Sequence, residues 1–110
     1  MNDTMPVYKR GERPAPYIVK FRTTAGPMNL NGWTPELHWY NPATQASTVD
    51  AGACIIGSVV EGEVEVTWPD ALMDSTTPMI YTNVWIEKDI YVYSSDDIII
   101  TLEEPAGGSA

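Results

Sequence analysis

The stretch Glu61–Pro69, EGEVEVTWP, carries the clearest structural signal in the chain. Glutamates stand at positions 61, 63 and 65, and apolar side chains stand at 64, 66 and 68. Side chains two positions apart share one face of a β-strand, so the pattern predicts a strand with an apolar and an acidic face. Neighbouring carboxylates on that face would lie about 7 Å apart, too far to share a proton. We therefore interpret Glu63 and Glu65 as the exposed side of a sheet, with Val64, Val66 and Trp68 buried.

The same period-two alternation recurs along the chain and predicts further strands. The predicted strands are Tyr17–Thr23, Trp33–Tyr40, Ala53–Val60, Glu63–Trp68, Met79–Glu87 and Asp97–Leu102. Between the strands, residues 41–51 are predicted to form a polar loop, and Lys88-Asp89 a hairpin tip. Residues 70–78 are the one segment able to hold a helical turn, with Asp70 or Asp74 as its cap. In the last strand, Ile98, Ile100 and Leu102 should face the core.

Short strands at such regular spacing indicate an all-β fold. About seven strands in roughly 100 residues are typical of an immunoglobulin-like antiparallel β-sandwich, and a small β-barrel is the alternative. We expect three regions: an extended basic N-terminal arm over residues 1–16, the sandwich over 17–104, and a flexible tail over 105–110.

Charge is distributed unevenly along this chain of 110 residues and net charge −9. Five of the six lysines and arginines fall within the first 22 residues, whereas 13 acids and one base follow position 25. An acidic body repels nucleic acid. No apolar run reaches the length of a membrane span, and the N-terminus lacks the pattern of a secretory signal. We expect neither nucleic acid nor membrane as a partner.

Few residues offer catalytic or metal-binding chemistry. The single cysteine, Cys54, lies in the apolar run ACII and reads as a small buried hydrophobe. The single histidine, His38, falls on the polar face of its strand, and no recognised metal or catalytic motif occurs. The acidic pairs near residues 96 and 103 suit solvation better than a calcium cage, which needs six or more oxygens. We expect no cofactor, no metal and no enzymatic activity.

Contact residues are predicted in two places. Tyr81 and Trp85 fall on the opposite face of their strand from its isoleucines and valine, and exposed aromatics mark interfaces or sugar platforms. The arm carries cations that could lie on an acidic neighbour, such as another copy of the domain. The predicted partner-binding residues are Tyr8, Lys9, Arg10, Arg13, Tyr81 and Trp85.

The order of turns and strands resembles a known family. The segments "PYIVKFRTTAGPMNLNGWTPELHWYNPA", "EGEVEVTWP", "IYTNVWIEKD" and "DDIIITLEE" are similar to the immunoglobulin-like domain at the N-terminus of phage baseplate upper proteins, which also occurs alone among phage head and tail proteins. The shared features are the step Leu30–Trp33, the Asn41-Pro42 turn and the glycine-led strand Gly62–Trp68. The resemblance covers residues 14–104, although Pro78–Tyr81 lacks the glycine that the family places before its tyrosine.

The resemblance implies a virion component and no catalytic residue. We therefore expect a non-catalytic structural protein of a tailed bacteriophage, assembled in the bacterial cytoplasm. It would act through contacts with other virion proteins and with copies of itself, in the neck, tail or baseplate, or as capsid decoration. The alternative is a small carbohydrate- or cell-surface-binding module that uses the exposed tyrosines and tryptophans.

Overall fold

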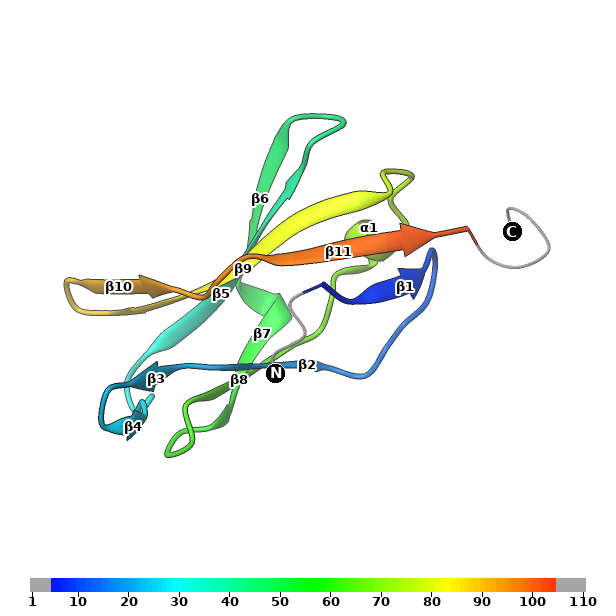
Figure 1. The fold of residues 1–110 in the computed structure, drawn as a ribbon. Helices are drawn as coiled ribbons and strands as arrows, with labels where there is room; N and C mark the ends of the chain where they lie inside the picture. The colour runs from blue at the N-terminus through cyan, green and yellow to red at the C-terminus, as the bar shows by residue number, and fades with distance from the viewer. Residues whose placement is uncertain (1–4, 105–110) are drawn as a thin grey trace.

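A computed structural model describes residues 5–104 (Figure 1). The expected tail and the first four residues of the expected arm lie outside the described residues. In chain order, the elements are β1 (Val7–Lys9), β2 (Tyr17–Lys20), β3 (Arg22–Thr23), β4 (Gly26–Pro27), β5 (Thr34–Asn41), β6 (Ala46–Asp50), the 3-10 turn η1 (Ala51–Ala53), β7 (Cys54–Ser58), β8 (Glu63–Val66), α1 (Asp70–Met73), β9 (Met79–Lys88), β10 (Tyr91–Ser94) and β11 (Ile98–Glu103).

The strands form a large sheet and a smaller one that face each other across the core. The large sheet has the order β1-β11-β9-β5-β6, with β10 also paired to β9, and the smaller sheet has the order β2-β8-β7. The strands β3 and β4 form a separate hairpin beside them. The chain passes from β2 in the smaller sheet to β5 and β6 in the large one, back to β7 and β8, and then to β9–β11, a strand order typical of immunoglobulin-like sandwiches. The predicted all-β sandwich is confirmed, and it holds additional short strands at its edges.

The core between the sheets follows the predicted alternation. Val64 and Val66 of β8 have no exposed surface, and Trp68 just after the strand is almost fully buried. The inward side chains of β11 are buried as predicted, namely Ile98, Ile100 and Leu102. From the large sheet, Leu37 of β5 and Val84 of β9 complete the same cluster. Period two therefore assigned the faces of these strands correctly.

The acidic face of β8 is more covered than we expected. Glu61 lies in the turn before the strand, while Glu63 and Glu65 are half-buried rather than exposed. Glu65 pairs with Ile18 on one side and Ile55 on the other, and its side chain lies over Gly57, which has no side chain of its own. Glu65 is partly shielded from solvent because it lies between two isoleucines and occupies the space that a side chain at position 57 would fill.

Short elements account for the other differences from the sequence-based expectations. The predicted polar loop 41–51 contains β6, which pairs with β5 at the edge of the large sheet. The helical turn α1 forms where expected, but Pro69 is its N-cap and no side chain caps it. Of the expected arm, residues 7–9 form β1, which runs parallel to β11. The predicted hairpin forms one residue later than expected, because Lys88 still pairs with Tyr91 and the turn is made by Asp89 and Ile90, with Asp89 at a positive φ of 56°.

The turn before β8 approaches the β2–β3 segment so closely that only glycine fits at position 62. The carbonyl of Gly62 accepts a hydrogen bond from the Phe21 N–H (2.8 Å), and Phe21 is the residue at which the predicted strand 17–23 divides into β2 and β3. A Cβ on Gly62 would lie 2.3 Å from the Phe21 carbonyl oxygen and 2.8 Å from that of Met28. Gly62 also has a positive φ of 70°. Sterics and backbone conformation therefore both require glycine here.

Gly11 provides a matched control for a test of this constraint. It also has a positive φ, of 87°, but a Cβ there would meet nothing within 4 Å. We expect Gly11→Ala to lower the free energy of unfolding by about 1–2 kcal/mol through the left-handed conformation alone. Gly62→Ala should cost a further 1–3 kcal/mol or so, because two rigid carbonyl groups must move. Equilibrium urea unfolding measures both, and equal losses would show that the contact is not tight.

Candidate functional site

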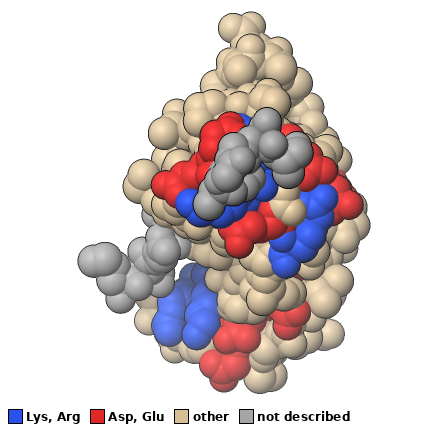
Figure 2. All heavy atoms as spheres, turned by 90° about the vertical axis from the view of Figure 1, so that its right-hand side faces the viewer, with Lys and Arg blue, Asp and Glu red and all other residues tan. Residues whose placement is uncertain are grey.

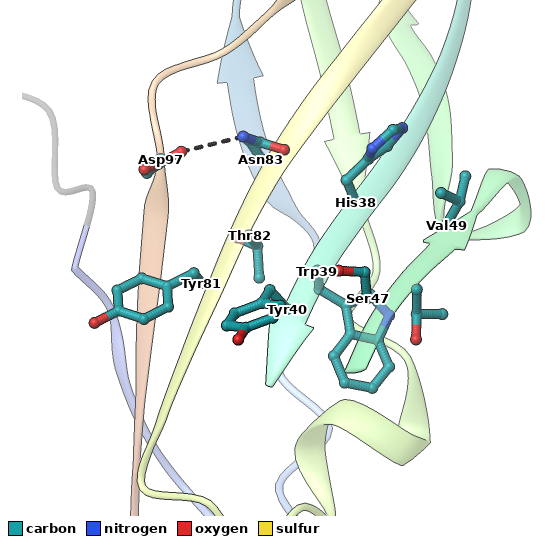
Figure 3. A pocket seen from close by; sticks show the side chains of 10 residues that line it. His38, Trp39, Tyr40, Ser47, Val49, Tyr81, Thr82, Asn83 and Asp97 are labelled. Carbon is teal, nitrogen blue, oxygen red and sulfur yellow. Dashed lines mark hydrogen bonds between the residues drawn. The ribbon is translucent and has the colours of Figure 1, made fainter. Parts of the chain in front are cut away.

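The outer face of the large sheet presents a continuous group of aromatic and polar side chains. Strands β5 and β9 are antiparallel, and their register places Tyr40 opposite Tyr81 and His38 opposite Asn83 (Figure 3). Tyr40 and Tyr81 are each 37% exposed. Val49 of β6, the cross-strand neighbour of His38, is 59% exposed. We call this set, together with Trp85, Glu36 and Asp97, the outer face.

Hydrogen bonds and stacking hold the polar part of the outer face in place. The Trp85 indole N–H donates to Asn83 Oδ1 (2.8 Å), and Asn83 Nδ2 donates to Asp97 Oδ1 (3.1 Å). The His38 ring stacks on Trp85 with centroids 4.8 Å apart and planes 19° from parallel. His38 Nε2 lies 2.7 Å from Glu36 Oε2. This chain of contacts crosses β5, β9 and the start of β11, so the side chains are ordered before any partner arrives.

A shallow hollow of about 160 Å³ opens on this face. Its lining residues are His38, Trp39, Tyr40, Ser47, Thr48, Val49, Tyr81, Thr82, Asn83 and Asp97. Pockets for drug-sized ligands measure roughly 300–1,000 Å³, so the hollow is smaller than a typical small-molecule site. At roughly 30 Å³ per water molecule, the volume equals about five waters. It suits one inserted side chain or one edge of a sugar ring.

The outer face contains both predicted contact aromatics of β9, Tyr81 and Trp85, and adds residues that the sequence did not single out. Tyr81 is exposed as predicted, and Trp85 is half-buried because His38 covers it. Val49 was missed because its segment read as a loop. The role of Asp97 was missed because its partner, Asn83, is distant in sequence and only the strand pairing brings them together.

The predicted contact residues at the N-terminus pair with their own chain. Lys9 lies 3.0 Å from Glu103, and Arg10 contacts Glu104 and donates from Nε to the Ser75 carbonyl (2.8 Å). In Figure 2, lysine and arginine side chains are interleaved with aspartates and glutamates on the face that forms the right-hand side of Figure 1. The cations and carboxylates therefore compensate one another within one chain.

Arg13 and Tyr8 also join the arm to the body of the domain. Arg13 Nε lies 3.0 Å from Asp70, and its Nη2 lies 3.1 Å from Asp74. The hydrogen bond to Asp74 raises the pKa of Arg13 above its usual value, so it stays charged. The Tyr8 hydroxyl accepts a hydrogen bond from the indole N–H of the buried Trp68 (3.2 Å). These contacts hold the N-terminal segment that contains β1 against α1 and Trp68.

The single cysteine lies in the core, and the potential metal ligands within residues 5–104 are dispersed. Cys54 is buried as predicted, and burial raises the pKa of its thiol to about 12, with the charges of Asp50 and Glu36 adding to the shift. Its reactive thiolate is therefore scarce near neutral pH. No group of three or more histidine, cysteine or acidic side chains in this range is arranged to hold a metal ion. Within the same range, no helix is long and apolar enough to cross a membrane.

Comparison with known proteins adds no family to this description. No protein-family model matches the chain, and a search of curated proteins finds no match.

The contacts of the N-terminal segment lead to a prediction about truncation. Deleting residues 1–13 removes β1, the buried Pro6 and the hydrogen-bond partner of Trp68. Losing a half-buried aromatic side chain alone should cost about 2 kcal/mol. We therefore expect the melting temperature to fall by about 10 °C in a thermal melt followed by circular dichroism.

The matched control for this truncation keeps the strand and removes charge only. In the double variant Lys9→Gln with Arg13→Gln, β1 and Tyr8 remain, and exposed ion pairs are individually weak. Its melting temperature should stay close to that of the parent. A truncated protein that melts with the parent would mean that the segment is an independent arm, as the sequence alone suggested.

Proposed function

We propose that this protein is a non-catalytic structural component of a tailed-phage particle that works through protein–protein contacts made by the outer face. The observation that carries the contact role is the outer face itself, where Tyr40, Tyr81 and Val49 are exposed beside an ordered polar network. Tyrosine and tryptophan are enriched at protein interfaces, and preordered side chains lose little entropy on binding.

The particle context of this proposal comes from the resemblance to phage immunoglobulin-like domains. The strand order of the two sheets supports that resemblance, because it is the order of an immunoglobulin-like sandwich. Such sandwiches host many unrelated functions, so the fold is compatible with a contact module without specifying it. Neck, tail or baseplate is the proposed location, with capsid decoration as the second choice, and copies of the same chain are among the proposed partners.

A carbohydrate-binding role is the second candidate, and one specific observation favours it. In the hollow, the Asn83–Asp97 hydrogen-bonded pair lies beside the exposed ring of Tyr81 (Figure 3). An aromatic ring beside amide and carboxylate groups offers both a flat apolar surface and hydrogen-bond partners for sugar hydroxyls. The hollow is small and open, so only part of a sugar ring would be enclosed.

Incorporation into particles tests the proposed contact role. We expect Tyr81→Ser combined with Val49→Ser to reduce the amount of this protein in purified particles by about tenfold or more, since truncating interface anchors typically costs over 1 kcal/mol each. Quantitative mass spectrometry of particles grown with each variant measures this. A thermal melt of the purified double variant verifies that it is folded.

Ile18→Ser combined with Ile55→Ser serves as the matched control. These two side chains are also exposed, at 43% and 62%, but they lie on the outer side of the smaller sheet. The control variant should be incorporated like the parent protein. Absence of the parent protein from purified particles would refute the virion role. Equal incorporation of both double variants would refute the outer face as the contact surface.

A further inference from the structure

The outer face holds no lysine or arginine although it carries carboxylates. All six lysines and arginines of the chain lie within the described residues, and none of them lines the hollow. Four of them are engaged in ion pairs elsewhere, namely Lys9, Arg10, Arg13 and Lys20. The charge of Asp97 in the hollow therefore has no cationic partner among residues 5–104. With a net charge of −9, the whole molecule adds a negative field at this surface.

The hydrogen bonds around Asp97 leave it able to accept more. Its Oδ1 accepts from Asn83 Nδ2, whose amide orientation is set by the Trp85 indole N–H. A carboxylate has about four acceptor positions, and a single donor occupies one of them. The side chain is therefore held in one orientation at the rim of the hollow, with further acceptor positions free for a donor from outside.

The aromatic part of the hollow suits a flat cation. Tyr40 and Tyr81 are direct cross-strand neighbours, and both are partly exposed and line the hollow (Figure 3). A guanidinium group stacks on aromatic faces and also binds carboxylates with two parallel donors. A lysine ammonium is a compact, strongly hydrated charge and uses such a flat surface less well.

We propose that this hollow receives an arginine side chain of a partner protein, with the guanidinium over the Tyr40 and Tyr81 rings and paired to Asp97. The inference rests on the proposed function, because it specifies the chemistry of the partner at the same surface. The volume of about 160 Å³ fits the end of one long side chain rather than a larger ligand. A neutral sugar would satisfy the hydrogen-bonding groups but would leave the charge of Asp97 without a partner.

Titration with a capped amino acid tests the arginine site directly. The probe is N-acetyl-arginine amide, and the matched probe is N-acetyl-citrulline amide, in which a neutral urea group replaces the guanidinium. We expect saturable shifts of the Trp85 indole and Asn83 amide signals in two-dimensional NMR spectra with the arginine probe. The citrulline probe should bind about tenfold more weakly, because it lacks the positive charge that strengthens hydrogen bonds to a carboxylate.

Two variants show whether the shifts come from the hollow. Asp97→Asn keeps the size of the side chain and removes its charge, so it should weaken the arginine probe about tenfold and the citrulline probe much less. Ile55→Ala, on the other sheet, should change neither. The arginine site would be overturned by equal shifts with both probes or by the absence of any saturable shift. Saturation only with a neutral monosaccharide such as N-acetylglucosamine would also overturn it and would favour the sugar role.

Particle incorporation of Asp97→Asn separates this inference from the proposed function. If the arginine site is correct, this single variant should be depleted from particles along with the Tyr81→Ser and Val49→Ser double variant. If Asp97→Asn is incorporated normally while the double variant is depleted, the outer face remains the contact surface and the arginine site is refuted. If both variants are incorporated normally, the proposed function fails together with the inference.

Discussion

The pairing of β9 with β5 is the constraint on which the rest of the structure depends. Their antiparallel register runs from Thr34 opposite Glu87 to Tyr40 opposite Tyr81. It places Ile80 and Val84 of β9 in the core without exposed surface. A slip by one residue would exchange the two faces of β9 and drive Asn83 and Trp85 toward the core. The buried Thr82 opposes such a slip, because its hydroxyl donates to the Ile98 carbonyl (2.7 Å) and thereby also fixes β11.

The same register builds the outer face. Because side chains alternate along β9, burial of its isoleucines and valine requires its aromatic and amide side chains to point outward. The stacking of His38 on Trp85 and the hydrogen bond from Asn83 to Asp97 then follow from which strands are neighbours. The core and the proposed contact surface are two consequences of one strand pairing. A substitution that shifts the register should therefore disturb both.

Alternation in the sequence was enough to predict the long strands and the core positions within them. Trp68 and the inward side chains of β11 were assigned correctly because a period of two is unambiguous over six or more residues. The edge strands β1, β6 and β10 were missed, because they are short and none of them has a buried face that would produce the apolar–polar alternation of the longer strands. The partners of Glu65 and Asp97 could not be predicted, since both depend on cross-strand register rather than on nearby sequence.

The charge pattern of the sequence located the cations of the N-terminal segment but did not predict their partners. The cluster of cations is evident in the sequence, but the sequence does not show which carboxylates they meet. In the structure, α1 and the end of β11 present acids on either side of β1, so Arg13 and Lys9 find partners in their own chain. Parallel pairing of β1 with β11 brings these groups together, and such a long-range contact leaves no local pattern.

Side-chain footprinting of the protein inside purified particles tests the proposed contact surface most directly. Hydroxyl radicals modify exposed aromatic and aliphatic side chains, and the rates for the free and the assembled protein can be compared residue by residue. If the outer face is the contact surface, Tyr40, Tyr81 and Val49 should be protected in the particle, while Ile18 and Ile55 on the smaller sheet keep their free rates. Protection confined to Ile18 and Ile55, or to Ile90 and Tyr91 at the β9–β10 hairpin, would contradict it.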